Sequence, residues 1–348
     1  MLWTKDCNQK WLNRAIFTKL AILNLTIMKH LKYLTLLSLA FIFSCEKEST
    51  TITLPPNIST SSPSEISQFF SSNESEFSES FNENSSIYYQ TITSDNGINY
   101  IYGPNTFLTS DGNPVSGSFV ITVNDAITNN QMLLMNKPTF TKNGELLVSG
   151  GIVKLVATQN GQTLSINNDE PVQVVIPTND YNPMSFFDGS EDNNGNFGWE
   201  LEDDTIDLVE NFDSTGNGQF TSLGLSFELD SIGWINCDYF YSSGDPLTGV
   251  TVNLPEGYTG ANSTVFIFYN TINSLATLYD ADEDGTFDLG YNYETPIGMD
   301  VTFVIVSEID GQYYYALSPS IITNNHIEEI SVMTVVTEED LENYINGL

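Results

Sequence analysis

Residues 144–176 carry the runs Gly144-Glu-Leu-Leu-Val-Ser149, Ile152-Val-Lys-Leu-Val-Ala157, Thr163-Leu-Ser-Ile166 and Val172-Gln-Val-Val-Ile176. Each run is short and rich in β-branched or other apolar residues, which is typical of strands. The dipeptides Asn143-Gly144 and Asn160-Gly161 are hairpin signals, because both residues tolerate the positive φ of a tight turn. This stretch is therefore predicted to form antiparallel strands.

The same pattern continues on both sides of this stretch. Further strand-like runs begin near residues 98, 118, 196, 219, 232, 250, 264, 275, 301 and 312. Many short strands separated by turn residues are typical of β-sandwiches. Pro177 and the run Asn179-Asp-Tyr-Asn-Pro183 interrupt the pattern. We therefore expect a mainly β protein with two Ig-like β-sandwich modules, the first at 86–180 and a second, β-rich module at 181–336.

Two further segments flank these modules. Thr337 is followed by three acidic residues, which favours a helix N-terminus and predicts a short terminal helix at 337–348. Residues 45–85 are rich in Ser, Thr, Asn, Pro and Glu, which is typical of a solvated, disordered tether. Within it, apolar residues of 64–81 recur at helical spacing and predict a short helix.

The N-terminal region has the layout of a secretory signal. Basic residues after Met28 precede the apolar run Leu34–Phe43, and small Ser44 precedes Cys45. We interpret 28–44 as a lipoprotein signal peptide and Cys45 as the lipidated first residue of the mature protein. Residues 1–27 fit no targeting logic, and we interpret them as an extension from a mis-called start codon. The alternative is an uncleaved anchor, although the run is shorter than the roughly 20 residues that span a bilayer.

Charge excludes several classes of partner. The chain has 45 acidic and 10 basic residues and a formal net charge of −35. After Cys45 the only basic residues besides His326 are Lys47, Lys137, Lys142 and Lys154. Nucleic acid and anionic lipid surfaces both need clustered Lys and Arg, so we expect neither as an electrostatic partner. Adaptation to salty surroundings and binding of divalent cations remain as two interpretations of the charge.

Two stretches together resemble a known group of proteins. One runs from Pro104 to Val123 and leads to Leu146–Ile152, and the other is Gly233-Trp-Ile-Asn-Cys-Asp-Tyr-Phe-Tyr241, followed by a turn at 254–258. They resemble uncharacterised Bacteroidota envelope lipoproteins, whose first module is similar to a ZU5-like β-sandwich. The resemblance implies a sandwich fold and a place at the outer membrane, facing the cell surface. Lys47 and Glu48 are similar to the surface-export tag of such lipoproteins. No catalytic residue is implied.

The clearest candidate metal site lies at 280–288. Oxygen ligands recur there at the positions of a calcium loop, with Gly285 at the sixth position: Asp280, Asp282, Asp284, Thr286 and Asp288. The twelfth position is Tyr291, so the closing bidentate carboxylate is missing. The alternative is a β-hairpin that turns at Asp284-Gly285 and presents acidic residues to solvent.

The chain offers few of the residues and motifs that enzyme mechanisms need. His326 is the only histidine after the signal, no Gly-rich phosphate loop is present, and nucleotide use is not expected. Cys237 lies among apolar residues and is predicted to be a buried thiol, and Trp199 and Trp234 are predicted to be core residues rather than sugar-stacking platforms.

We expect a non-enzymatic, lipid-anchored cell-envelope protein with a structural, adhesive or partner-binding role, for which calcium is a candidate stabilising ion. Its expected partners are the membrane, through the anchor, and a surface protein or a glycan. The alternatives are a glycan-binding lipoprotein of a polysaccharide-uptake system and a paired-carboxylate glycosidase.

Overall fold

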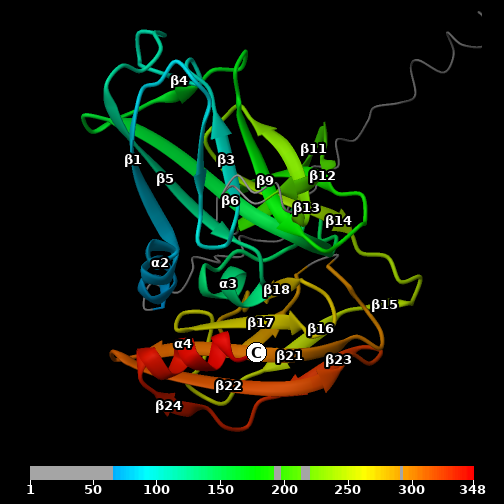
Figure 1. The fold of residues 1–348 in the computed structure, drawn as a ribbon. Helices are drawn as coiled ribbons and strands as arrows, with labels where there is room; N and C mark the ends of the chain where they lie inside the picture. The colour runs from blue at the N-terminus through cyan, green and yellow to red at the C-terminus, as the bar shows by residue number, and fades with distance from the viewer. Residues whose placement is uncertain (1–65, 192–196, 213–219, 291–292) are drawn as a thin grey trace, which may run out of the picture. The chain divides into compact units, whose positions relative to one another are not determined.

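The computed structural model describes residues 66–191, 197–212, 220–290 and 293–348, all within one compact unit, Ile58–Leu348 (Figure 1). Strands account for most of the described chain, which confirms the predicted mainly β class. The strands group into an N-terminal sandwich and a C-terminal sandwich. The expected extension, signal peptide and Cys45 lie outside the described residues.

The N-terminal sandwich consists of two main sheets and a small ribbon. The first has the order β1 (Ser78–Asn84), β5 (Ser118–Ala126), β6 (Leu147–Gln159), β14 (Trp234–Phe240), β10 (Ser185–Glu191) and β11 (Phe197–Thr205), with β7 (Gln162–Thr163) paired to β6. The second has the order β12 (Asp207–Phe212), β13 (Phe220–Leu229), β9 (Val172–Thr178), β3 (Asn99–Tyr102) and β2 (Gln90–Thr93). The ribbon pairs β4 (Phe107–Leu108) with β8 (Ser165–Ile166).

The C-terminal sandwich is smaller. Its larger sheet has the order β18 (Leu275–Leu278), β17 (Ser263–Tyr269), β21 (Asp300–Ile309), β22 (Gln312–Ile321) and β24 (Thr334–Val336). Its smaller sheet has the order β19 (Thr286–Asp288), β16 (Val250–Asn253) and β23 (His326–Glu329), where β16 and β23 run parallel. A further ribbon pairs β15 (Leu247–Thr248) with β20 (Thr295–Pro296).

Three helices complete the described part of the chain: α2 (Ser67–Glu76), α3 (Asn129–Leu134) and α4 (Glu338–Asn346). The Thr337 side chain caps α4 by accepting from the Asp340 amide, which confirms the predicted terminal helix. Thr128 and Gln131 form a reciprocal capping box at α3. These two caps fix where α3 and α4 begin.

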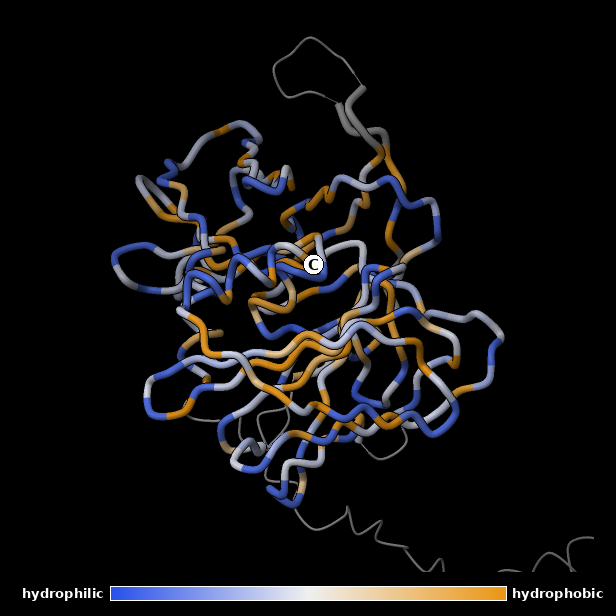
Figure 2. The backbone as a smooth tube through the Cα atoms, turned by 90° about the horizontal axis from the view of Figure 1, so that it is seen from below, coloured by the Kyte–Doolittle hydropathy of each residue, from blue (hydrophilic) through white to orange (hydrophobic). Residues whose placement is uncertain are grey.

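Apolar residues form three clusters. One lies between the two sheets of the N-terminal sandwich and includes Tyr100 and Val153, and another fills the C-terminal sandwich around Phe303. The third joins all three helices to strands of both sandwiches, and includes Trp199 and Phe266. In Figure 2 the strands carry most of the hydrophobic residues and the peripheral loops are largely hydrophilic. Because this third cluster contains residues of both sandwiches, the two sandwiches share part of their hydrophobic core.

Helix α2 is fixed by an ion pair in this shared region. Glu74 accepts from Lys137 at 3.1 Å and lies 3.8 Å from Lys154. The Lys137 ammonium also lies 4.8 Å from the ring centre of Phe197 and 5.0 Å from that of Trp234, which are cation–π distances. Lys137 is buried, so these neighbours take the place of water around its ammonium group.

The expected domain boundaries were wrong at two places. A break between 180 and 181 would separate β9 from β13 and β6 from β14, yet both pairs are hydrogen-bonded neighbours. Residues up to β14 therefore complete the N-terminal sandwich, and the second sandwich begins near β15. The expected tether at 45–85 also overlaps α2 and β1, which are part of the core and the sheet. Helix α2 confirms the helix predicted within 64–81.

Candidate functional site

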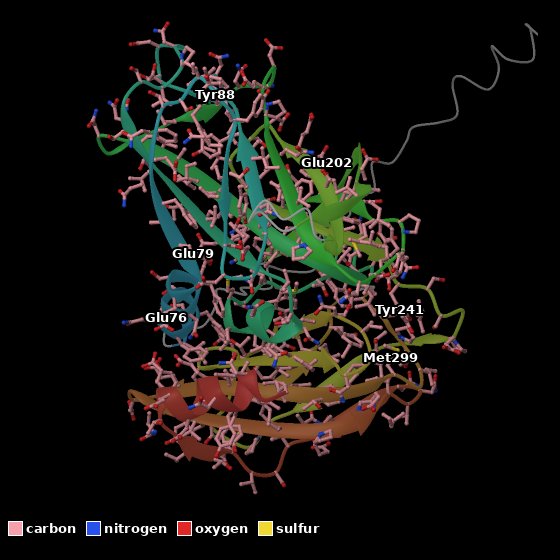
Figure 3. All side chains as sticks on the ribbon, viewed as in Figure 1. Glu76, Glu79, Tyr88, Glu202, Tyr241 and Met299 are labelled. Atoms are coloured by element: carbon pink, nitrogen blue, oxygen red, sulfur yellow. The ribbon has the colours of Figure 1, made fainter. Side chains whose placement is uncertain are left out.

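Three consecutive apolar side chains are exposed in the loop between β1 and β2. Ile87, Tyr88 and Tyr89 are 80, 72 and 68 % exposed. The loop begins with two fixed contacts, because the Ser85 amide donates to the Gly117 carbonyl and the Gly117 amide donates to Ser85 Oγ, each at 2.9 Å. Figure 3 shows Tyr88 at the end of the N-terminal sandwich away from α2. Exposed apolar groups that gather in this way mark interaction sites.

A groove of about 310 Å³ lies next to the start of this loop. It is lined by the end of β1, the start of β5 and the β6–β7 turn: Asn82, Glu83, Asn84, Ser118, Phe119, Val120, Thr158, Gln159, Asn160 and Gly161. Most of these side chains carry amides or hydroxyls, which both donate and accept hydrogen bonds. We call this groove and the Ile87–Tyr89 loop together the tip.

Hydrogen bonds hold several groups of the tip in place. The Tyr102 hydroxyl donates to Glu83 Oε2 at 2.8 Å, and burial and this contact raise the pKa of Tyr102. Gln159 Nε2 donates to the carbonyls of Ser116 and Ser118, both at 2.9 Å. Gln90, at the far end of the loop, pairs with Tyr102, so the loop runs from β1 of the first sheet to β2 of the second.

A second contact fixes the Tyr89 side of the tip. A Cβ at Gly103 would lie 1.8 Å from Glu170 Oε1 and 3.0 Å from Tyr89 Cε1, so both side chains cover this glycine. Glu170 is held in turn by Asn105, whose Nδ2 donates to Glu170 Oε2 at 2.9 Å. Glycine at 103 therefore lets the Tyr89 ring and a polar pair approach the sheet edge.

The predicted calcium residues form a closed turn. Asp280 is buried, and its carboxylate accepts from the amides of Gly260 (2.9 Å), Gly285 (2.8 Å) and Asp284 (3.1 Å). Asp282 and Asp284 are exposed, and Asp288 accepts from Thr251 Oγ1. No group of three or more His, Cys, Asp or Glu side chains in the described ranges is placed to hold a metal ion. The Asp280 oxygens accept from backbone amides, as expected of the hairpin alternative.

We predict that Asp280→Ala lowers the free energy of unfolding of the purified protein by about 2–4 kcal/mol, because three amides lose an anionic acceptor. The matched control is Asp282→Ala, which removes an exposed carboxylate and should change stability by less than about 0.5 kcal/mol. Melting curves recorded with calcium and with chelator should coincide for all three proteins. A calcium-dependent rise in melting temperature that Asp282→Ala abolishes would restore the metal site.

The two tryptophans named in the sequence analysis are core residues. Trp199 is fully buried, its indole donates to the Pro138 carbonyl at 2.6 Å, and Trp234 is 8 % exposed. The predicted core placement is confirmed, and neither ring offers a face for sugar stacking. Cys237 is also buried, as predicted, and burial raises the pKa of its thiol.

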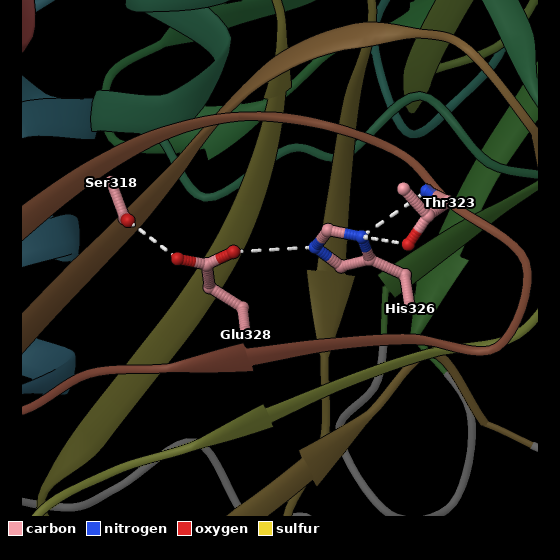
Figure 4. A network of polar contacts seen from close by, with 4 residues as sticks. All are labelled: Ser318, Thr323, His326 and Glu328. Carbon is pink, nitrogen blue, oxygen red and sulfur yellow. Dashed lines mark hydrogen bonds and ion pairs between the residues drawn. The ribbon is translucent and has the colours of Figure 1, made fainter.

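His326 belongs to a polar network in the C-terminal sandwich (Figure 4). Its Nδ1 accepts from the Thr323 amide at 3.2 Å, and its Nε2 lies 3.3 Å from Glu328 Oε2. Ser318 Oγ donates to the other Glu328 oxygen at 2.6 Å. The carboxylate thus lies between the hydroxyl and the imidazole, whereas a catalytic triad needs the serine on the histidine. The network joins β22 to β23 and is structural.

Asp238 is a second buried acid. It lies at an irregularity in the β14–β6 pairing, and its Oδ2 accepts from Asn236 Nδ2 at 2.6 Å. Asn236 Oδ1 accepts in turn from Ser149 Oγ at 2.8 Å. Burial raises the pKa of Asp238 well above its ordinary value, which favours a neutral carboxyl in the core.

The sequence did not indicate the tip as a site. Ile87, Tyr88 and Tyr89 fall at the start of the first expected module, 86–180, and an apolar residue followed by two tyrosines has the composition of a strand. The signal for a loop was Ser85-Ser86 immediately before it, and the Tyr88 amide does donate to Ser86 Oγ at 3.0 Å. Exposure itself depends on which strands cover the loop, and the sequence carries no direct mark of that.

Comparison with known proteins gives no relative: no protein-family model matches the chain, and no curated protein matches it. Within the described ranges, no helix is both long and apolar enough to cross a bilayer. Any role of the tip therefore follows from the geometry of the tip alone.

Proposed function

We propose that the protein is a non-enzymatic binding protein, anchored to the outer membrane by lipid on Cys45, that presents its tip at the cell surface to a partner. The observation that carries the proposal is the exposure of Ile87, Tyr88 and Tyr89 beside a polar groove. The signal layout at 28–44 supports the location. The calcium role is not part of the proposal.

The tip has the features of a recognition surface. Tyrosine offers a rigid apolar ring and a polar end, and it loses little conformational entropy on binding. The loop that carries Tyr88 is fixed at Ser85 and Gly117, so a partner meets an ordered surface. Leaving three apolar side chains in water costs free energy, and contact with a partner recovers it.

The groove supports binding better than hydrolysis. Glu83 is the one carboxylate in its lining, and its Oε2 accepts from Tyr102. A glycosidase needs two carboxyl groups about 5–10 Å apart across the substrate. Asp188, whose pKa is raised by partial burial and then by nearby Asp230, belongs to an exposed pair away from the groove. The glycosidase alternative therefore gains no support from the tip.

The proposal is tested by labelling cysteines on intact cells that produce the full chain. Ser116→Cys and Tyr181→Cys each place a thiol at an exposed site. One lies beside the tip, where the Ser116 carbonyl accepts from the groove residue Gln159, and the other lies in the β9–β10 loop. The unsubstituted protein is the control, because Cys237 is buried and the lipid blocks Cys45. The reagent is a maleimide that does not cross membranes.

We expect Tyr181→Cys to label on intact cells, since the protein faces outward. Ser116→Cys should label at least threefold less on intact cells than after detergent extraction, because a partner covers the tip. Labelling of both variants only after lysis would contradict the surface location. Equal labelling of Ser116→Cys before and after extraction would contradict the binding role of the tip.

A further inference from the structure

We infer that the tip binds an uncharged polysaccharide, with sugar hydroxyls in the groove and a sugar ring on Tyr88. The inference rests on the proposed function, because it names the partner of the same surface. It is carried by the chemistry of the groove lining, the distribution of charge and the exposed rings.

The lining suits a ligand made of hydroxyl groups. Side-chain amides come from Asn82, Asn84, Gln159 and Asn160, and hydroxyls come from Ser118 and Thr158. A sugar hydroxyl donates one hydrogen bond and accepts others, so groups that do both can satisfy it in several orientations. Some of these groups are already oriented, since Ser118 Oγ donates to Asn84 Oδ1 at 2.7 Å.

Charge argues against an anionic ligand. The chain carries a net charge of −35, and the groove lining contains no lysine. The described lysines are engaged elsewhere: Lys137 and Lys154 contact Glu74, and Lys142 contacts Glu200 at 3.2 Å. A polyanion would meet repulsion without a compensating cation. An uncharged polymer avoids this cost.

The exposed rings supply the apolar part of the interaction. One face of a sugar ring presents C–H groups, and these pack on the electron-rich face of an aromatic ring. Tyr88 and Tyr89 are both exposed, and they follow the groove residue Asn84 by four and five positions. The loop that carries these rings begins directly after the groove residue Asn84, so we place the rings and the groove in one site that extends beyond one sugar. The groove volume is at the lower end of the range for small-ligand sites, about 300–1,000 Å³.

A peptide that adds a strand to β1 is the main competing partner, because β1 is the outer strand of its sheet. Strand β1 carries Glu79 and Glu83, and charged residues on an outer strand discourage such pairing. Strand addition relies on main-chain hydrogen bonds, whereas the groove lining offers side-chain amides. The observations therefore favour the polysaccharide, and the peptide becomes an outcome of the test.

The test is affinity electrophoresis of the detergent-solubilised full chain in native gels. The gels contain either a neutral polymer (a β-glucan, a galactomannan, a xylan or dextran) or anionic alginate. We expect at least one neutral polymer to retard the protein and alginate to leave it unretarded. Tyr88→Ala and Asn160→Ala should each weaken the dissociation constant at least tenfold. Tyr181→Ala, which removes an equally exposed tyrosine outside the tip, should bind as the unsubstituted protein does.

Melting temperatures check that the exposed substitutions leave the fold intact. Retardation by no neutral polymer, or equal retardation of Tyr88→Ala and the unsubstituted protein, would overturn the inference. If no neutral polymer binds while Ser116→Cys is shielded on intact cells, the partner is a protein; the proposed function then stands and this inference falls. If the thiol beside the tip is not shielded on intact cells either, both the proposed function and this inference are contradicted.

Discussion

Lys137→Ala should lower the free energy of unfolding of the purified protein by about 2–4 kcal/mol, because it removes a buried side chain from the core together with its ion pair to half-buried Glu74. Lys137 is buried, and its ammonium contacts Glu74 of α2 at 3.1 Å. The same group lies over the rings of Phe197 and Trp234. Alanine would leave Glu74 with only the more distant Lys154 and would open a space beside both rings.

Lys142→Ala is the matched control for this prediction. Lys142 also pairs with a glutamate, Glu200 at 3.2 Å, but its side chain is 36 % exposed and that of Glu200 is 69 % exposed. Exposed pairs contribute about 0–1 kcal/mol, so this variant should change stability little. Equilibrium unfolding in urea, followed by tryptophan fluorescence, measures both variants. Similar small losses for Lys137→Ala and Lys142→Ala would show that α2 does not depend on the buried pair.

The sequence predicted the strands because their signals are local. The Asn160-Gly161 turn is an example, since both residues have positive φ values, 52° and 77°, between β6 and β7. The terminal helix was equally accessible, because Thr337 caps it through a contact three residues away. Burial of Trp199 followed from the general tendency of large aromatic residues to lie in cores.

The arrangement of the strands was not accessible in the same way. Strand β6 pairs with β14, and β9 pairs with β13, across 45 or more residues of sequence. A proline-rich interruption at 177–183 marks a turn, and a turn within a sandwich has the same composition as a turn between two sandwiches. The sequence predicted helix α2 but not its place in the core, since that depends on Phe69 and Phe70 meeting distant strands.

The candidate site was the least predictable part. Ile87, Tyr88 and Tyr89 have the composition of a strand, and only their position beyond the end of β1 makes them exposed. The acidic run at 280–288 has the spacing of a calcium loop, but the position of Asp280 relative to Gly260 turns its carboxylate toward amides. In both cases a contact between distant segments decides what the residues do.

Cys45→Ser should have the largest effect in the cell, because the proposed function makes Cys45 the acceptor of the lipid. Each buried methylene of an acyl chain contributes about 0.8 kcal/mol to membrane binding, and two or more chains give stable anchoring. The negative charge of the protein offers no electrostatic attraction to an anionic bilayer that would replace them. We therefore expect the substitution to change the location of the protein and to leave its fold intact.

The deciding measurement is fractionation of cells that produce the unsubstituted protein or Cys45→Ser, with the mass of the polypeptide determined in each fraction. The account predicts that the unsubstituted protein sediments with membranes, begins at Cys45 and carries acyl chains. It predicts that the Cys45→Ser protein is found in the soluble fraction or retains the 28–44 segment. A Cys45→Ser protein of unchanged polypeptide length that still sediments with membranes would contradict the lipid anchor.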